Sequence, residues 1–544
     1  MLFQKKSFQV WGILCLTLFA FLFMARVGLF KGGSDSATNV PAPPGGGVAS
    51  AIEPGESYMA VFQDGRHIGF SHRVLEQSST GFRILERTFM KVNTMGMVQD
   101  LTVRSDTVTE SDLSLRSFDF EVGSGRFQFR VKGAVEEMSL GVTTAANNQT
   151  PSSLVKIRLT RKPFLIGLIA PAMTGLVPLD ENDSSNGPFQ EMTFSVFDPV
   201  TMGEMDVGVR VVGEETMAVM GQKTSVKKLA VKAKGMTQYS FVDATGRVVR
   251  EEGLLGITLV AATRQDALKG IVAGDDLTLA ASVIPVWNLE PSKGDGIDQP
   301  VDEGRNFSKP PWNDRVKTCS KLSLKISGID PLDFDLDGGR QILCNNRLTI
   351  IRESPGSEPS MSEELSGQKA FPGLGSFLEP GPLVQSDHPD IQALADKIMD
   401  SQGDNYNDIR EDSQGSANGK IRAVLTWMDE HIQKRPLVSL PNAISTLETR
   451  MGDCNEHAVL FAALCRSLGI PTRIEAGLVF LNDRFYYHAW NGVFLGSWIT
   501  VDPLFNQFPA DVTHLRLVSG QGGEGFDILG AIGRIKVEIT GVEP

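Results

Sequence analysis

Hydrophobic and polar residues alternate along most of the segment 52–287, and this alternation predicts β-strands. The stretch Arg126–Gly133 reads RFQFRVKG, with an apolar side chain at every second position from Phe127 onward. Thr245-Gly246 stands between two such stretches as the expected bend of a hairpin. A period of two in β-branched and aromatic residues is typical of antiparallel strands that bury one face. We therefore expect a large antiparallel β domain at 52–287.

From about residue 385 the apolar spacing changes to that of amphipathic helices. His388–Met399 and Gly419–Arg435 carry apolar side chains at helical intervals. Alternating stretches follow at Phe485–Leu495 and Gly496–Phe505, and these predict two adjacent strands. The pattern indicates an α+β domain at 385–520, in which a helix packs on an antiparallel sheet.

Polar stretches rich in glycine and proline divide the chain into further segments. We expect linkers at 31–51, 288–318 and 353–384. A small β unit lies between the last two linkers, at 319–352. A C-terminal tail with a short strand follows the α+β domain, at 521–544.

The amino terminus carries one long apolar segment. As a helix, residues 8–30 extend about 34 Å, enough to cross a bilayer of roughly 30 Å. Lys5 and Lys6 precede this segment and favour an N-terminus on the inside. We expect a single-pass transmembrane anchor at 8–30, which places the bulk of the chain in the periplasm or outside the cell.

A cleaved signal peptide and a buried core helix are the alternatives for the same segment. Cleavage requires small residues at the third and first positions before the cut. A cut after Ala25 would place Phe23 at the third position, and a cut after Gly28 would place Arg26 there. Neither site fits, so the uncleaved anchor is the favoured interpretation.

Charge and cysteine content narrow the classes of partner. The formal net charge is −13 and the sequence pI is about 5.2, so we expect no nucleic-acid partner. Five cysteines are too few for a disulfide-built scaffold. Cys319 and Cys344 flank a strand–turn–strand segment and form either a disulfide or two free thiols. The oligomeric state stays open.

The candidate chemistry begins at Cys454. Gly452-Asp453 precedes a long apolar helical stretch that Gly469 and Pro471 end, so Cys454 falls in the first helical turn. Unpaired backbone N–H groups and the helix dipole stabilise a thiolate there, so we expect a lowered pKa at this thiol. Cys465 lies in the middle of the same helix and is expected to pack in the core.

A thiol nucleophile needs a base and a group that orients the base. His488 lies in the first of the two predicted strands, and Asp502 ends the second, where Pro503 stops it. A hairpin around Gly496 would bring His488 and Asp502 within hydrogen-bonding distance. A cysteine on a helix against a histidine and an aspartate on a sheet is the papain-like arrangement.

Three segments then carry a family resemblance. GDCNEHAVLFAALCRSLGIPTR, YYHAW and WITVDPLF closely resemble the signature blocks of the transglutaminase-like superfamily, in the same order and with similar short spacings. The resemblance covers about 385–520, and membrane-anchored bacterial proteins of this superfamily are built similarly. It implies that Cys454 is the nucleophile, His488 the base and later acid, and Asp502 the orienting residue.

The implied reaction is acyl transfer. The Cys454 thiolate attacks an amide or peptide carbonyl of a protein or peptide substrate, His488 protonates the leaving amine, and a thioester forms. The backbone N–H of Cys454 is a candidate oxyanion donor. We expect a cysteine peptidase or amidase; the alternatives are a cross-linking transglutaminase and a non-catalytic scaffold that binds a partner.

Other residues near this motif have less specific interpretations. His457 forms Cys-x-x-His with Cys454, but a metal site needs further ligands at suitable spacing, so we expect no metal and no cofactor. His514 is interpreted as structural. Trp490, Tyr486 and Tyr487 are expected to pack within a strand.

Overall fold

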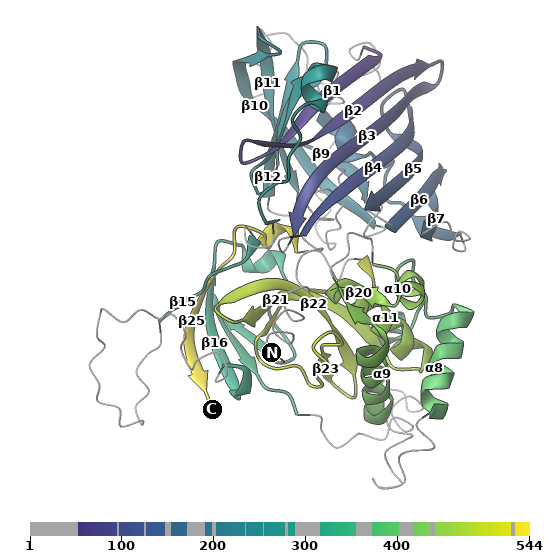
Figure 1. The fold of residues 1–544 in the computed structure, drawn as a ribbon, viewed down its shortest axis with the longest axis vertical. Coiled ribbons are helices and arrows are strands. Elements are labelled where there is room, and N and C mark those ends of the chain that lie inside the picture. The colour runs from purple at the N-terminus through teal and green to yellow at the C-terminus, as the bar shows by residue number, and fades with distance from the viewer. Residues whose placement is uncertain are drawn as a thin grey trace.

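The computed structural model describes two bodies, with the N-terminal β domain above the C-terminal domain in Figure 1. The residues it describes are 53–94, 97–124, 127–146, 154–170, 191–198, 203–233, 236–253, 255–277, 281–288, 316–354, 373–401, 417–435, 441–523 and 528–544. The predicted anchor at 8–30 and linker at 31–51 lie outside these residues. None of the helices in the described part of the chain has the length and apolar character needed to span a bilayer.

The upper body is a 14-stranded antiparallel sheet, as the alternating pattern predicted. Its spatial order is β8-β7-β6-β5-β4-β3-β2-β1-β14-β13-β12-β11-β10-β9. Every neighbouring pair except β1 and β14 is consecutive in the chain, so successive hairpins build most of the sheet. The strands are β1 Gly55–Gln63, β2 Arg66–Ser78, β3 Gly81–Thr94, β4 Met97–Glu110, β5 Leu115–Ser124, β6 Phe127–Glu136, β7 Ser139–Ala146, β8 Val155–Arg158, β9 Met192–Asp198, β10 Gly203–Val219, β11 Gln222–Ala233, β12 Met236–Asp243, β13 Val248–Glu252 and β14 Ile257–Ala262.

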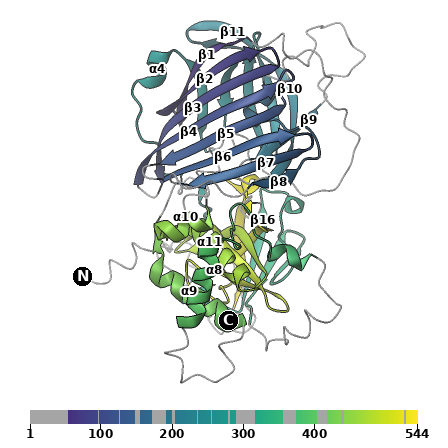
Figure 2. The ribbon, with the colours of Figure 1, turned by 90° about the vertical axis from the view of Figure 1, so that its right-hand side faces the viewer.

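The large sheet curls because twisted strands accumulate rotation from one to the next. Figure 2 shows β2 to β8 side by side across one face, with β10 behind them. The inner side chains form an apolar core that includes Phe82, Ile84 and Val131. The predicted bend at Thr245-Gly246 joins β12 to β13, with Gly246 at a φ of +78° and Thr245 N–H donating to the Asp243 carboxylate at 3.0 Å.

The lower body contains a five-stranded sheet in the order β15-β25-β16-β18-β17. The small β unit and the C-terminal tail, which the sequence suggested as separate segments, share this sheet because β25 pairs with β16 along its length. The sequence pattern gives no signal for this pairing, because the two strands lie far apart along the chain. The strands are β15 Val286–Trp287, β16 Lys321–Ser327, β17 Gln341–Cys344, β18 Arg347–Ile351 and β25 Lys536–Glu543.

Cys319 and Cys344 are both free thiols, so the disulfide interpretation is wrong for this structure. Strand β18 lies between β16, which follows Cys319, and β17, which ends at Cys344. Cys319 is buried and donates to the carbonyl of Val316 at 3.1 Å, whereas Cys344 is exposed. The intervening strand keeps the two sulfur atoms on different parts of the sheet.

Helices and a four-stranded antiparallel sheet form the rest of the lower body. The sheet order is β23-β22-β21-β24, and α11 packs against β22 and β21 (Figure 1). The elements are α8 Pro389–Ser401, α9 Ala417–His431, α10 Ala443–Thr449, α11 Cys454–Ser467, β21 Thr472–Leu481, β22 Arg484–Phe494, β23 Trp498–Val501 and β24 His514–Gly520. Shorter elements of the lower body are β19 Gln433–Lys434, β20 Met451–Gly452, η4 Pro331–Asp333, η5 Leu374–Phe377 and η7 Leu529–Ala531, and those of the β domain are η3 Ile166–Leu168 and α4 Arg264–Leu268.

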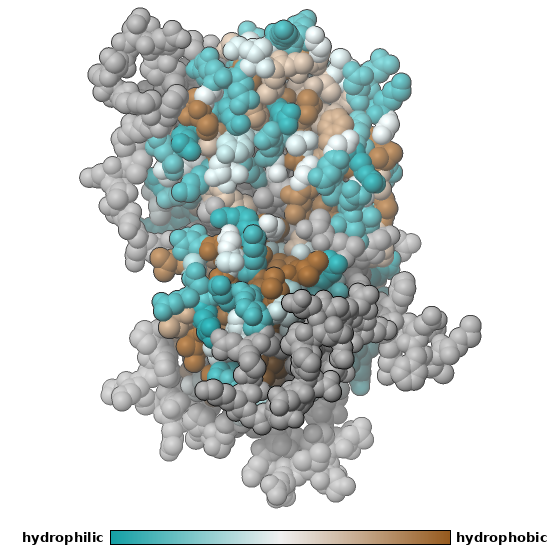
Figure 3. All heavy atoms as spheres, turned by 90° about the vertical axis from the view of Figure 1, so that its left-hand side faces the viewer, coloured by the Kyte–Doolittle hydropathy of each residue, from teal (hydrophilic) through white to brown (hydrophobic). Residues whose placement is uncertain are grey.

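The two bodies meet where the chain leaves the β domain. Val283 exchanges two backbone hydrogen bonds of 2.8 Å with Phe485 of β22, and Trp287 meets Phe480 edge to face. Among the residues that Figure 3 colours, polar side chains are interspersed with apolar groups over the β domain. The chain that leaves the β domain is thus tied directly to the strand that carries His488.

Candidate active site

A capping box fixes the start of helix α11. The Asp453 carboxylate accepts from the backbone N–H of Asn455 at 2.9 Å, and the Glu456 carboxylate accepts from the backbone N–H of Asp453 at 2.9 Å. Reciprocal capping of this kind satisfies donors that a helix start leaves unpaired. Gly452 is required before it, because a Cβ at this position would lie 2.3 Å from the Cβ of Glu456. Cys454 is therefore the first residue of the helix, as the sequence predicted.

The thiol of Cys454 is fully buried, and this overturns the expected thiolate. Burial, followed by the negative charge of Asp453, raises the pKa of Cys454 well above its ordinary value, and the backbone N–H of Ala489 only partly opposes the rise. Glu456 adds to the rise. Burial and the acidic residues Asp453 and Glu456 thus oppose the stabilisation that the helix dipole offers a thiolate at this position.

Strand pairing brings His488 and Asp502 together. In the hairpin, Asn491 of β22 lies opposite Val501 of β23, and Gly496 in the turn has a φ of +83°. Asp502 is the next residue after Val501, and its Oδ2 lies 2.7 Å from Nε2 of His488. Both side chains are fully buried. The hydrogen bond predicted from the hairpin is confirmed.

Four hydrogen bonds hold the Asp502 carboxylate. Its Oδ1 accepts from the backbone N–H groups of Leu504 at 2.8 Å and Phe505 at 2.9 Å. Its Oδ2 meets His488 and a second histidine, His514, whose Nε2 lies 2.9 Å away. Burial alone would raise the pKa of Asp502, but the hydrogen bonds from His488 and His514, and the charge that these rings carry when protonated, lower it below the usual range. Asp502 is therefore a buried carboxylate ion.

His514 was not expected at the site, because its interpretation was only structural. It is the first residue of β24, and its Nδ1 lies 3.2 Å from both the backbone oxygen and the Oδ1 of Asp511. Burial lowers the pKa of His514, but hydrogen bonds from its ring to Asp502 and Asp511 outweigh burial and raise it to about 9. The sequence offered one signal for this role, a histidine at the start of the strand that follows Asp502. That signal can be interpreted only when the order of the strands in the sheet is known.

The other ring nitrogen of His488 defines its chemical state. Because Asp502 is an acceptor, Nε2 of His488 carries the proton, and Nδ1 presents a lone pair. Among the described residues no group hydrogen-bonds to this buried Nδ1. Burial lowers the pKa of His488, so the ring is neutral. The half-buried Phe505 stacks on it with ring centroids 4.8 Å apart.

Helix α11 is locked against the strand that carries His488. The side-chain amide of Asn491 donates to the backbone oxygen of Ala458, one turn beyond Cys454, at 3.0 Å. The sulfur of Cys454 lies beside the backbone N–H of Ala489, the residue after His488. The structure thus places the buried Cys454 sulfur against the strand residue that follows His488, whose ring pairs with Asp502.

Neighbouring residues have other partners. His457 is fully buried, its Nδ1 lies 2.7 Å from the backbone oxygen of Asp453, and burial lowers its pKa to about 4. Trp490 donates its indole N–H to Glu475 at 2.7 Å, and Tyr487 donates its hydroxyl to the backbone oxygen of Ala531 at 2.9 Å. Cys465 is buried, as predicted, and burial raises the pKa of its thiol.

His488, Asp502 and His514 also form the kind of group that can bind a metal ion. Ligands about 2.0–2.2 Å from a tetrahedral ion are separated from one another by about 3.3 Å. The two Nε2 atoms lie 2.7 and 2.9 Å from Oδ2 of Asp502, which are hydrogen-bond distances. The geometry is therefore that of N–H groups donating to a carboxylate.

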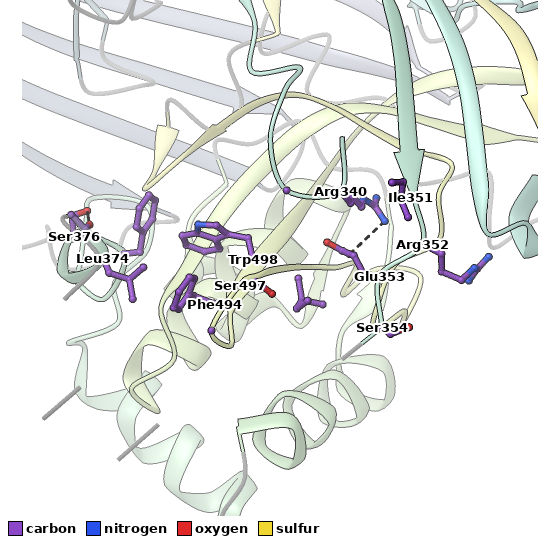
Figure 4. A pocket seen from close by; sticks show the side chains of 15 residues that line it. Arg340, Ile351, Arg352, Glu353, Ser354, Leu374, Ser376, Phe494, Ser497 and Trp498 are labelled. Atoms are coloured by element: carbon purple, nitrogen blue, oxygen red, sulfur yellow. Dashed lines mark hydrogen bonds and ion pairs between the residues drawn. The ribbon is translucent and has the colours of Figure 1, made fainter. Parts of the chain in front are cut away.

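A cavity of about 890 Å³ lies at the opposite end of β23 from Asp502. Figure 4 shows Phe494 and Trp498 along one wall and Arg340, paired with Glu353 at 3.6 Å, along another. None of the three candidate catalytic residues lines it. This cavity is thus not formed by the candidate catalytic residues.

Comparison with protein-family models identifies the superfamily that this part of the chain resembles. Residues 406–503 match the model of the transglutaminase-like superfamily, a range that includes Cys454, His488 and Asp502 but ends before His514. No curated protein matches the chain significantly.

Two solved structures show weak likeness to parts of the chain. One is a candidate cysteine protease from Cytophaga hutchinsonii, with 17% sequence identity and a TM-score of 0.26. The matched region covers 41% of this chain and 81% of that protein. The other is a β-barrel-like protein of a domain family of unknown function from Brucella abortus, at 12% identity and a TM-score of 0.28, covering 39% and 95%. Both TM-scores are below 0.5, so neither likeness bears on function.

Proposed function

We propose, from the membership of residues 406–503 in the transglutaminase-like superfamily, that this protein is a thiol enzyme that forms a thioester on Cys454. One observation carries the proposal. His488 donates Nε2–H to Asp502 at 2.7 Å and its Nδ1 keeps a free lone pair, while the Cys454 sulfur lies at the backbone N–H of Ala489, the next residue along the strand. A neutral, oriented imidazole beside a thiol is what general-base activation of a nucleophile requires.

The high pKa of Cys454 decides how the proton moves. A thiol that stays protonated at neutral pH must lose its proton as the sulfur attacks, and Nδ1 of His488 receives that proton. The sulfur bonds to the carbonyl carbon of an amide, and the oxygen becomes an oxyanion. The His488 imidazolium then returns the proton to the amide nitrogen, the C–N bond breaks, and a thioester and an amine result.

The second half of the reaction removes the acyl group from the sulfur. A water molecule gives its proton to His488 and attacks the thioester carbonyl. The C–S bond breaks, releasing a carboxylic acid and restoring the thiol. We favour hydrolysis over transfer to an amine because water needs no dedicated acceptor site. The substrate class in this proposal is a protein or peptide amide.

The cellular location is part of the proposal and rests on the sequence. The apolar segment at 8–30 and the glycine- and proline-rich segment at 31–51 support a membrane anchor with a flexible linker. In this arrangement the enzyme acts outside the cytoplasm, at the distance from the membrane that the linker allows.

An acylation experiment tests the proposed nucleophile. The full chain is incubated with p-nitrophenyl acetate, and p-nitrophenol release and the mass of the acylated peptide are followed. We expect acetyl transfer to Cys454, abolished by Cys454→Ala and retained in Cys465→Ala, the matched change eleven residues along the same helix. Equal acylation of Cys454→Ala and the unchanged protein would refute the thiol enzyme and leave the scaffold interpretation.

A second experiment separates hydrolysis from transfer. A glutamine-containing peptide is incubated with the protein, with and without a primary amine, and ammonia, cleavage products and amine incorporation are measured. Hydrolysis predicts products that form at the same rate without the amine. Amine incorporation that exceeds hydrolysis would instead establish the cross-linking alternative.

A further inference from the structure

Three acceptor atoms surround the ring of His514. Nε2 lies 2.9 Å from Oδ2 of Asp502, and Nδ1 lies 3.2 Å from both Oδ1 and the backbone oxygen of Asp511. A neutral imidazole has one N–H and one lone pair, so one of its nitrogens would point its lone pair at acceptors. Both nitrogens can donate only if the ring is an imidazolium cation.

The two carboxylates are themselves ionised, which removes the alternative that one of them donates to His514. Asp511 accepts hydrogen bonds from the backbone N–H of Thr513 at 2.9 Å and from the side-chain amide of Gln507 at 3.1 Å. Asp502 accepts from two backbone N–H groups as well as from the histidines. Carboxylates with this many donors remain charged even when buried.

The other charged groups near His514 do not replace it. His488 lies on β22, which β21 separates from β24, and its neutral ring hydrogen-bonds to Asp502 alone. Arg340 donates to the backbone oxygen of His514 at 3.1 Å, and its guanidinium is paired with Glu353 at 3.6 Å. Glu475 of β21, which pairs with β24, is held by Arg473 at 2.7 Å. His514 is therefore the cation in direct contact with Asp502.

We infer that His514 is a positioning residue of the proposed reaction, a buried imidazolium that holds Asp502 in place and neutralises it so that His488 stays an uncharged base. The inference rests on the proposed function, because it concerns the residue that acts on Cys454. His514 does not touch the reacting atoms and acts through Asp502. The family match ends at residue 503 and does not assign this histidine.

The inference predicts how loss of the cation changes His488. Without His514, the negative charge of Asp502 acts on His488 alone and favours its protonated form, so the pKa of His488 rises. A larger share of His488 is then protonated near neutral pH and cannot accept the Cys454 proton. A purely structural histidine would lower the amount of folded protein without moving this pKa.

The kinetic test compares His514→Gln with His431→Gln, a matched change at an exposed histidine. Glutamine keeps an N–H donor toward Asp502 and removes the charge. We expect acylation of Cys454 by p-nitrophenyl acetate to fall roughly tenfold to a hundredfold, as for other residues that orient a reacting group. The acid limb of the pH–rate profile should also move to higher pH. Thermal melts confirm that both variants fold.

A spectroscopic test needs no variant to be active. The chain has seven histidines, so ¹⁵N-histidine labelling of the full-length protein gives few imidazole signals, and those lost in His514→Gln belong to His514. We expect both of its nitrogens to be protonated at pH 7. A neutral His514 ring would overturn the inference even if the enzyme is active.

The outcomes separate the two proposals. If the unchanged protein is acylated at Cys454 and His514→Gln has the same rate and the same acid limb, the positioning role is wrong and the proposed function stands. If the unchanged protein is not acylated, the proposed function fails, and with it the role of His514 in catalysis. The protonation state of His514 is still decided by its nitrogen signals.

Discussion

Nε2 of His488 lies 2.7 Å from Oδ2 of Asp502, and both side chains are completely shielded from solvent. A buried ion is tolerated only where hydrogen bonds replace water, and Asp502 has four of them. This one contact sets the tautomer of His488, and with it the side of the ring that is free to act as a base.

Asp502→Asn should leave the fold intact and remove most of the activity. The asparagine oxygen can keep the backbone hydrogen bonds from Leu504 and Phe505, but its NH₂ group cannot accept from His488 and favours the wrong tautomer. We expect acylation of Cys454 to fall by about 10²–10⁴-fold. Stopped-flow release of p-nitrophenol measures the loss, with the exposed Asp483→Asn as control. Activity within a factor of two of the unchanged protein would contradict the orienting role.

Alkylation of Cys454 should be slow at neutral pH and accelerate with rising pH. The thiol is buried and its pKa is raised well above the ordinary value, so the thiolate is rare at pH 7. The rate of iodoacetamide labelling from pH 6 to 10, located by peptide mass spectrometry, tests this. Native protein labelled at pH 7 as fast as its urea-unfolded form would show that the thiolate is already present.

Phe505→Ala should make the cluster more accessible. Phe505 stacks on His488 and is only half-buried, so it is part of the outer cover of the histidine. Truncation should increase Cys454 alkylation several-fold and lower the free energy of unfolding by about 1–3 kcal/mol, less than for a fully buried phenylalanine. Phe377→Ala, in the wall of the cavity at the other end of β23, is the control. Unchanged labelling in Phe505→Ala would mean that other groups cover the thiol.

Gly452→Ala should disturb the helix start that presents Cys454. The new Cβ would lie 2.3 Å from the Cβ of Glu456, so the capping box must shift. We expect a loss of about 1–3 kcal/mol of stability, measured by urea unfolding, together with reduced acylation. Gly381→Ala is a matched control because an added Cβ there meets no atom within 4 Å. Equal stability of the two variants would show that the helix start adapts without cost.

The stability of the protein should decrease on the alkaline side because of His514. Its pKa is raised to about 9, so its contribution is complete below the unfolded value of about 6.5 and is lost as pH rises toward 9. The shift corresponds to at most about 3 kcal/mol. Urea unfolding of the protein and of His514→Gln is measured at pH 6.5, 7.5 and 8.5. The contribution of His514 is the difference between the two proteins in how steeply the free energy of unfolding changes with pH. Parallel pH profiles would mean that His514 is not charged in the folded state.

The amino-acid pattern was sufficient wherever a feature depends on neighbours along the chain. Strand alternation predicted the large sheet, because the side chains of a strand alternate between faces regardless of the partner strand. Residue order and turn chemistry predicted the hairpin that joins His488 to Asp502. The family motif covered Cys454, His488 and Asp502 for the same reason, since all three lie in short segments with recognisable boundaries.

Features that depend on burial were predicted less well. The position of Cys454 at a helix start suggested a low pKa, but desolvation and the charges of Asp453 and Glu456 decide the outcome. Helix position can be inferred from local residues, whereas desolvation depends on everything that surrounds the sulfur. The possible disulfide between Cys319 and Cys344 was wrong for a related reason, because β18 lies between the strands next to these two residues.

The sequence by itself determined the order of the reacting residues, the helix start at Cys454 and the hairpin between His488 and Asp502. These are consequences of backbone geometry over a few residues. Only the tertiary structure decided that β24 lies next to β21, that His514 therefore reaches Asp502, and that the Cys454 thiol is buried among carboxylates. Electrostatics within a protein depends on distance through space and on access to water, and residues far apart in the chain set both.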